Sequence, residues 1–357
     1  MRDISNIEYT APKWIVLDGD IDTMWVESLN TVMDDNKILT LASNERIALK
    51  PDMRALFEIA NLTYASPATV SRAGILFVNP TDLGWQPFVQ SWVDKLENKA
   101  LQSAIPMLFE RYIPPCFEAH ITRLQTITPV TEWGMTNSLL KMLELVMTEE
   151  NLPPECAKDD YEYYFVFCAI WAFGGVMFKD QLVDWREVFS KWWQAEFKTV
   201  KFPATGTVFD YFLQRAADGH LIWVSWTTVV PSYTYDPELP LAAALVPTAE
   251  TVRLRFWMDL LINSNVPVLL AGYPGTGKTA LMLNALKALP EEDWQVAQTA
   301  FNHYTIHHMI QGVLEAPLEK KAGKNFGPPG MKHLVYFVDD LNMPEVDIYG
   351  TASPHTM

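Results

Sequence analysis

The sequence predicts an α/β protein in which parallel sheets are flanked by helices. A glycine-rich loop at 272–279 lies between an apolar run and a helical pattern. Two further apolar runs, at 14–17 and 334–338, each end in aspartate. Short continuous apolar runs of this kind are typical of strands buried in parallel sheets.

The glycine-rich loop matches the complete phosphate-binding pattern G-x-x-x-x-G-K-[ST]. The runs 268–271 and 280–289 predict the strand before the loop and the helix after it, which is the context that this motif requires. The alternative is a glycine-rich turn that binds nothing. In that case the match at every fixed position of the motif would be a coincidence. The loop residues are Gly272, Tyr273, Pro274, Gly275, Thr276, Gly277, Lys278 and Thr279.

The residue types in this loop indicate the phosphates of ATP and a Mg²⁺ ion as ligands. Glycines let backbone N–H groups converge on phosphate oxygens, and the N-terminus of the following helix adds the positive end of its dipole. We expect Lys278 to reach the β- and γ-phosphates and the Thr279 hydroxyl to bind Mg²⁺.

A second acidic element is expected to complete this site. The run 334–338 is followed by Asp339 and Asp340. A carboxylate at the C-terminal end of a parallel strand lies beside the phosphate loop, so Asp339 can hold Mg²⁺ through water. Asp340 occupies the position of a water-activating glutamate but is one methylene shorter, which predicts slow hydrolysis. By itself this signal is weak, because many strands end in acidic turns.

A similar acidic pattern occurs near the N-terminus. The run 14–17 ends at Asp18, which matches the metal-binding position, and Gly19 replaces the catalytic carboxylate. A strand is expected over 55–60, and the polar Asn61 after it can sense the γ-phosphate of a nucleotide. Between them, the segments 37–42 and 46–50 flank a polar turn and predict a hairpin.

Arg72 follows this second strand in the stretch 66–74. Considered alone, it is a surface cation, or forms an ion pair within its own module. The order of an acidic strand, a sensor strand and Ser71-Arg72 instead resembles the second half of an AAA+ nucleotide-binding core. In that fold the arginine is a finger presented to the ATP of the neighbouring module, and a catalytic role is the expectation for Arg72.

Longer segments resemble axonemal dynein heavy chains of the outer-arm type, and the similarity covers essentially the whole chain. The segments are WIVLDGDIDTMWVESLNTVMDDNK (14–37), LTLASNERI (39–47), ASPATVSRAGIL (65–76), AIWAFGG (169–175), FSKWWQAEFKTVKFP (189–203) and FVDDLNMPEVDIYGT (337–351). The resemblance implies AAA+ P-loop NTPase cores, each a parallel sheet flanked by helices, with a helical lid region between two partial modules.

The family order also implies the domain boundaries. Residues 1–83 resemble the C-terminal part of the second AAA+ module core, and 84–200 its helical lid. Residues 201–245 are expected to form a β-rich connector, with a short β-meander, and 246–357 the N-terminal part of the third module. Thr248 is expected to cap the first helix of that module.

The same resemblance implies the function of an ATP-binding segment of the ATP-driven, minus-end-directed microtubule motor of cilia and flagella. In the family the second module binds ATP without hydrolysing it, which agrees with Gly19, and its arginine finger serves the first module. The third module is a regulatory ATPase. Many of its loops in the family begin Gly-x-Thr-Gly or Gly-x-Ala-Gly, whereas Tyr273-Pro274 occupies that stretch here; Pro274 is expected to stiffen the loop and does not argue against binding. The implied partners are other AAA+ modules of the same heavy chain and, through the parent protein, dynein intermediate and light chains and microtubules. The implied location is the cytoplasm, the cytoskeleton and the ciliary axoneme.

The extent of the chain limits what it is expected to do alone. Too few residues precede Asp18 for a phosphate loop, and the chain ends soon after Asp340. We therefore expect two half-modules without the stalk, linker, tail or microtubule-binding tip, and no independent ATPase activity. Two alternatives stay open: a nucleotide-binding regulator or other AAA+ remodelling ATPase, and a degenerate AAA+ remnant with only an interaction role.

Composition excludes several classes of protein. The 357-residue chain is 49% hydrophobic, so it can bury a sizeable core and disorder is not expected. A net charge of −16 argues against nucleic acid or an anionic membrane as the main partner. The longest apolar run, 163–178, is shorter than the roughly 20 residues of a membrane span and predicts a buried helix. The N-terminus is polar, and 3 widely spaced cysteines predict reduced thiols.

Overall fold

The computed structural model describes residues 1–9, 11–19, 23–59, 61–153, 156–234 and 245–346. The chain divides into two compact units. One unit contains Met1–Asn79, Ala297–Gly330 and Tyr336–Met357, and the other contains Pro80–Val296 and Met331–Val335. The finer division into four parts that the sequence suggests stays a prediction.

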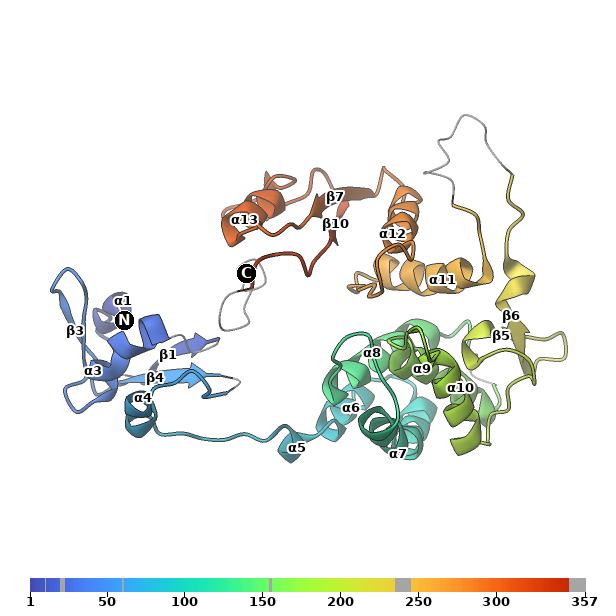
Figure 1. Ribbon diagram of the computed structural model, residues 1–357, viewed down its shortest axis with the longest axis horizontal. Helices are drawn as coiled ribbons and strands as arrows, with labels where there is room; N and C mark the ends of the chain where they lie inside the picture. The colour runs from blue at the N-terminus through green and yellow to red at the C-terminus, as the bar shows by residue number, and fades with distance from the viewer. Residues whose placement is uncertain (10, 20–22, 60, 154–155, 235–244, 347–357) are drawn as a thin grey trace. The chain divides into compact units, whose positions relative to one another are not determined.

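The N-terminal part of the first unit contains a short parallel strand pair and a hairpin (Figure 1). Strand β1 pairs in parallel with β4, in a register that runs from Lys13 opposite Met53 to Asp18 opposite Glu58. Strands β2 and β3 pair antiparallel around the turn that contains Asn44, whose φ is 62°. The strands predicted near 14–17 and 55–60 and the predicted hairpin are therefore confirmed. The elements are α1 (Arg2–Ser5), β1 (Lys13–Asp18), α2 (Thr23–Val26), η1 (Glu27–Leu29), α3 (Asn30–Met33), β2 (Ile38–Thr40), β3 (Arg46–Ala48), β4 (Met53–Glu58) and α4 (Pro67–Arg72).

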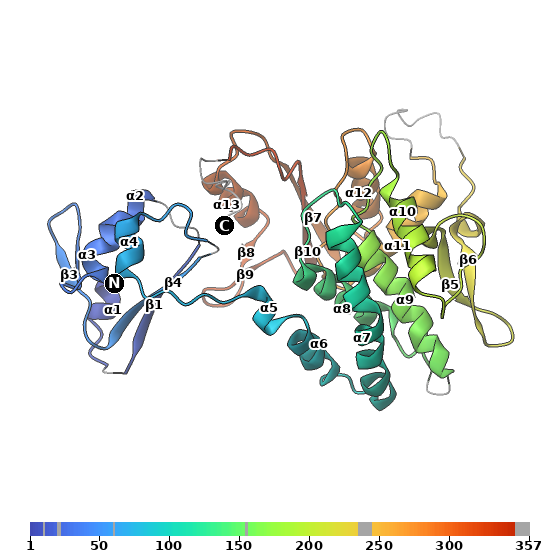
Figure 2. The same cartoon turned by 60° about the horizontal axis from the view of Figure 1, so that its bottom comes forward.

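The second unit begins with a helical bundle that contains most of the buried core. Polar caps fix where its long helices begin, because Asn98, Thr131 and Asp184 each accept a hydrogen bond from a backbone N–H of the first turn. Figure 2 shows α8 and α9 side by side in this bundle. The helices are α5 (Pro80–Leu83), α6 (Gln86–Val93), α7 (Lys99–Thr122), α8 (Glu132–Val146), α9 (Lys158–Gly174) and α10 (Trp185–Glu196).

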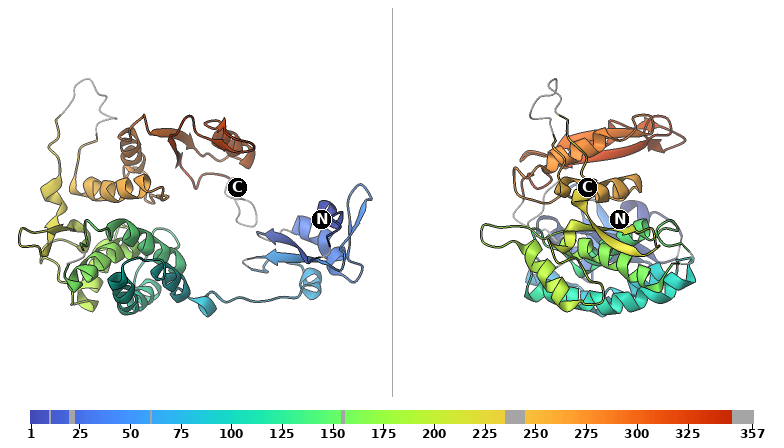
Figure 3. Two further views of the ribbon diagram at one scale, coloured as in Figure 1. Left: turned by 180° about the vertical axis from the view of Figure 1, so that it is seen from behind. Right: turned by 90° about the vertical axis from the view of Figure 1, so that its right-hand side faces the viewer.

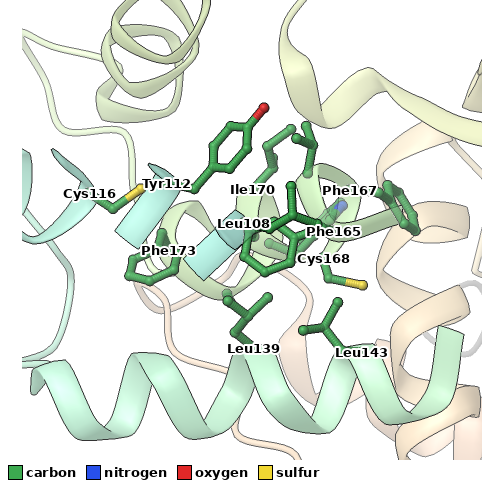
Figure 4. Close-up of a cluster of buried hydrophobic side chains, with 14 of the residues drawn as sticks. Leu108, Tyr112, Cys116, Leu139, Leu143, Phe165, Phe167, Cys168, Ile170 and Phe173 are labelled. Carbon is green, nitrogen blue, oxygen red and sulfur yellow. The ribbon is translucent and has the colours of Figure 1, made fainter. Parts of the chain in front are cut away.

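Helix α9 is the centre of the bundle and confirms the helix predicted over the long apolar run. Its residues from Tyr164 to Gly174 are all buried, and the helix ends at Gly174, before the run does. Figure 4 shows Phe165 and Phe173 of α9 among Leu139 and Leu143 of α8. A helix that is apolar all round is stable only when neighbours cover every face, so α9 depends on the surrounding helices.

All three cysteines are free thiols, as the sequence predicts. Cys116 on α7 and Cys168 on α9 are fully buried, and burial raises the pKa of both thiols well above the ordinary value. Both therefore behave as small apolar core residues. No helix in the described part of the chain is both long and apolar enough to cross a membrane.

A hairpin and a helix extend this unit toward the phosphate loop. Strands β5 (Tyr211–Arg215) and β6 (Leu221–Ser225) pair antiparallel, between the turns η2 (Val208–Asp210) and η3 (Trp226–Val229). The predicted meander is thus a two-stranded hairpin within the described residues, and 235–244 lie outside them.

The helix predicted to follow Thr248 is confirmed as α11 (Ala249–Asn263), with the Thr248 side chain as its cap. It packs on the bundle through Trp257, whose ring stacks on Phe167 of α9 at a centroid distance of 5.1 Å. In the left view of Figure 3, α11 is the gold helix directly above the green bundle. Helix α11 therefore joins the bundle to the segment that leads into the phosphate loop.

The last part of the chain forms a parallel strand pair and a further helix. Backbone bonds join Asp293 O to His333 N at 2.7 Å and Phe301 N to Asp339 O at 2.9 Å, so β7 and β10 run in the same direction. The predicted strand over 334–338 is confirmed, although its residues are half-buried rather than buried. The elements are α12 (Lys278–Lys287), β7 (Trp294–Ala300), α13 (His307–Glu315), β8 (Glu319–Lys320), β9 (Phe326–Gly327) and β10 (His333–Asp339).

The strand predicted over 268–271 does not form. The segment is neither helix nor strand and pairs with no strand in the described residues, and Leu269 is 72% exposed. A strand is stabilised by ladder hydrogen bonds to a neighbour, so apolar composition alone leaves such a segment unpaired.

Candidate nucleotide-binding site

Two glycines shape the phosphate loop. Gly275 has a φ of 77° and Gly277 a φ of 84°, in the left-handed region that side chains with a Cβ disfavour. Gly277 is the N-cap residue of α12, so the loop passes directly into the first turn of that helix. The first backbone N–H groups of a helix have no partner within the helix, so a loop that leads into a helix N-terminus is suited to bind an anion.

Lys278 begins α12 and folds back over the loop. Its Nζ donates to the carbonyl oxygens of Gly272 and Tyr273, both at 2.8 Å. The Thr276 hydroxyl donates to the same Tyr273 carbonyl at 2.9 Å. A Cβ added to Gly272 would lie 3.3 Å from Lys278 Cδ, so glycine permits this close approach. The cation is therefore held at the loop, where the phosphate-binding motif requires it.

The rest of the loop is open to solvent, and its helix is well anchored. Pro274 is exposed and Tyr273 is 52% exposed, while Thr279 is half-buried in the first turn of α12. Arg255 of α11 donates to Asn284 Oδ1 of α12 at 3.0 Å. The loop residues are thus accessible to a ligand, while the helix that follows them is fixed to α11.

Asp339 and Asp340 lie at the end of β10, as predicted. The Asp340 N–H donates to Asp339 Oδ1 at 3.0 Å, and Asp340 has a φ of 53°. Asp339 is half-buried and Asp340 is exposed. These aspartates belong to one compact unit and Lys278 to the other, so their joint use of one metal ion stays a prediction.

The N-terminal candidates lie at the carboxyl end of the β1–β4 pair. Asp18 ends β1 directly opposite Glu58, and the Gly19 N–H donates to the Glu58 carbonyl at 3.1 Å. Asn61 follows β4, and its side-chain oxygen accepts from the Thr63 N–H at 3.1 Å. Glu58 was not singled out from the sequence, because only the strand register places its carboxylate beside Asp18.

Arg72 is the last residue of α4 and forms an ion pair within its own unit. Its Nε donates to Asp34 Oδ1 at 2.7 Å, and its Nη1 donates to the Ala68 carbonyl at 2.8 Å. About a third of each charged side chain is exposed, at 32% and 39%. The structural alternative for Arg72 is therefore present, and the finger role stays a prediction.

A phosphate loop that opens a helix, attached to a helical lid bundle, defines a nucleotide-binding protein of the P-loop class. Family models give the finer assignment. Residues 105–228 match the dynein heavy chain AAA lid domain, and residues 233–357 match the P-loop containing dynein motor region. The chain belongs to the dynein heavy chain family, which confirms the resemblance and the fold class expected from the sequence.

Individual relatives support the same assignment over the whole chain. The ciliary dynein beta chain of Tripneustes gratilla is 57% identical over 357 residues, which is 100% of this chain. The human dynein axonemal heavy chain 17 is 54% identical over the same length, and the flagellar outer arm dynein beta chain of Chlamydomonas reinhardtii is 44% identical over 99% of the chain. The chain spans 8% of the length of each of these relatives.

Proposed function

We propose that this chain is an ATP-binding segment of an axonemal dynein heavy chain, the minus-end-directed microtubule motor of cilia and flagella. The observation that supports this most directly is the position of Lys278, at the start of α12 and over a loop with two left-handed glycines. The match to the dynein motor region supplies the class of protein.

The proposal gives each loop residue a task toward ATP and Mg²⁺. Backbone N–H groups around Gly275 and Gly277 would cradle the phosphates, and the Lys278 ammonium would balance their charge. The Thr279 hydroxyl and, through water, Asp339 would hold Mg²⁺, which neutralises charge on the phosphate oxygens when bound. Asp340 would orient water for hydrolysis at a low rate, because its side chain is short.

In the N-terminal half the proposal is binding without hydrolysis. Asp18 would bind the metal ion, Asn61 would contact the γ-phosphate, and Gly19 supplies no carboxylate to orient water. Arg72 would act on the ATP of a neighbouring module of the same heavy chain. Through the complete heavy chain, the partners would be further AAA+ modules, intermediate and light chains and microtubules, in the axoneme of cilia.

The test of this proposal is Lys278→Ala. Charge-assisted contacts to phosphate are worth roughly 1.5–3 kcal/mol each, so the affinity for a fluorescent ATP analogue should fall by at least about tenfold. Lys287→Ala is the matched control, since Lys287 is an exposed lysine in the last turn of the same helix. Titration is made in the 357-residue chain and in a heavy chain that contains this segment. Equal affinities for Lys278→Ala and the control would refute the assignment of the loop.

A further inference from the structure

An aromatic contact joins the lid bundle to the phosphate loop. The ring of Phe178, in the turn between α9 and α10, meets the ring of Tyr273 edge to face, at a centroid distance of 6.0 Å and an interplanar angle of 69°. Both residues belong to the same compact unit. Edge-to-face geometry is a favoured arrangement for aromatic pairs at this distance.

The turn that contains Phe178 is closed by several hydrogen bonds. The backbone carbonyl of Phe178 accepts a hydrogen bond from the Trp185 N–H at 2.9 Å. The Asp180 carboxylate accepts from the N–H groups of Leu182 and Val183, at 2.6 and 2.7 Å, and these bonds lower the pKa of Asp180. These bonds fix the backbone of the turn at Phe178, and Phe178 itself is half-buried.

Tyr273 links Phe178 to the phosphate-binding lysine, because its ring contacts Phe178 and its carbonyl contacts Lys278. Its carbonyl oxygen accepts from Lys278 Nζ and from the Thr276 hydroxyl. A change in the position of Tyr273 therefore moves an acceptor of the lysine ammonium. Tyr273 is 52% exposed, so it is only partly covered by the rest of the unit.

We infer that Phe178 is a positioning residue for the phosphate loop: it holds Tyr273 and, through the Tyr273 carbonyl, the ammonium of Lys278. This inference rests on the proposed nucleotide binding at the loop. It adds that the affinity of this site depends on a side chain of the lid bundle. Aromatic pairs of this geometry correspond to about a 2- to 10-fold change in affinity.

The test compares substitutions within the same turn. Phe178→Leu keeps apolar volume without the ring, and Phe178→Ala removes both, so each should weaken binding of N-methylanthraniloyl-ADP by about 2- to 10-fold. Phe178→Tyr keeps the aromatic ring, so its affinity for the nucleotide should equal that of the unsubstituted chain. Leu182→Ala is the matched control, because Leu182 lies in the same turn and is 93% exposed. The thermal unfolding midpoint is measured for every variant.

A double-mutant cycle with Tyr273→Ala separates positioning from general stability. Tyr273→Ala should cost as much affinity as Phe178→Leu, and the double variant should cost no more than either alone. Additive losses, unchanged affinity in Phe178→Leu, or losses that follow the unfolding midpoint would overturn the inference. Lys278→Ala in the same series distinguishes the two levels: if it binds normally, the nucleotide site itself is wrong, whereas weakened Lys278→Ala with normal Phe178→Leu contradicts only the positioning role.

Discussion

Replacing Trp257 by alanine should be among the most destabilising single changes in the chain. Trp257 is 4% exposed, and its ring stacks on Phe167 and lies 6.1 Å from the ring of Trp171. A tryptophan side chain buries about 150–250 Å², which at about 25 cal/mol per Å² corresponds to roughly 4–6 kcal/mol. Substitutions of buried aromatic residues by alanine cost about 3–5 kcal/mol, so the two estimates agree.

The loss should appear as a lower midpoint in urea unfolding followed by circular dichroism, with an unchanged dependence of the free energy on urea. Trp257→Phe is the milder variant, because Trp257 Nε1 has no hydrogen-bond partner within the described residues and its removal breaks no bond. Trp133→Ala is the matched control, since Trp133 lies on α8 of the same bundle and is 55% exposed. A cost below about 1 kcal/mol for Trp257→Ala would show that α11 is not fixed to the bundle by this stack.

Two further predictions concern titration and the arginine of α4. Burial lowers the pKa of His120, so the folded chain binds fewer protons than the unfolded chain, and stability should fall as pH decreases below about 6.5. His120→Gln should remove this part of the pH dependence, and urea unfolding at pH 7.5 and pH 5.5 compares the two; an equal loss in both proteins would contradict the assignment. Arg72→Ala and Asp34→Asn should each cost about 0–1 kcal/mol of stability, because their ion pair is partly exposed. If Arg72 is also a finger, Arg72→Ala alone should lower the ATPase rate of a heavy chain that contains this segment, by about 10³-fold; equal rates for the two variants would exclude the finger.

Elements whose signals are local could be predicted from the sequence. The loop pattern predicts a helix directly after the loop, and α12 begins there at Lys278; Thr248 caps α11 through the hydrogen bond that its residue type favours. The end of β10 at Asp339 follows from an apolar run that stops at a carboxylate. In each case, the residues that define the element lie within a few positions of one another, so no tertiary information is needed.

Features that depend on distant partners could not be predicted in this way. The run 268–271 has the composition of a strand, but a ladder requires a neighbour, and none of the described strands pairs with it. The pairing of Asp18 with Glu58 requires the register of two strands that are separated by a hairpin. The ion pair of Arg72 is a similar case, because its partner Asp34 follows the end of α3, 38 residues earlier in the chain.

The contact between Phe178 and Tyr273 is a further feature of the nucleotide-binding site that depends on a distant partner and could not be predicted from the sequence. From the sequence, Tyr273-Pro274 is a variation in the loop whose effect is stiffness. In the structure, the Tyr273 ring meets a side chain of the lid bundle, while its carbonyl accepts from the motif lysine. A loop residue that the motif leaves unspecified thereby links the nucleotide-binding lysine to a different part of the unit. If that link is energetic as well as geometric, substitutions in the lid bundle will change nucleotide affinity without altering any motif residue.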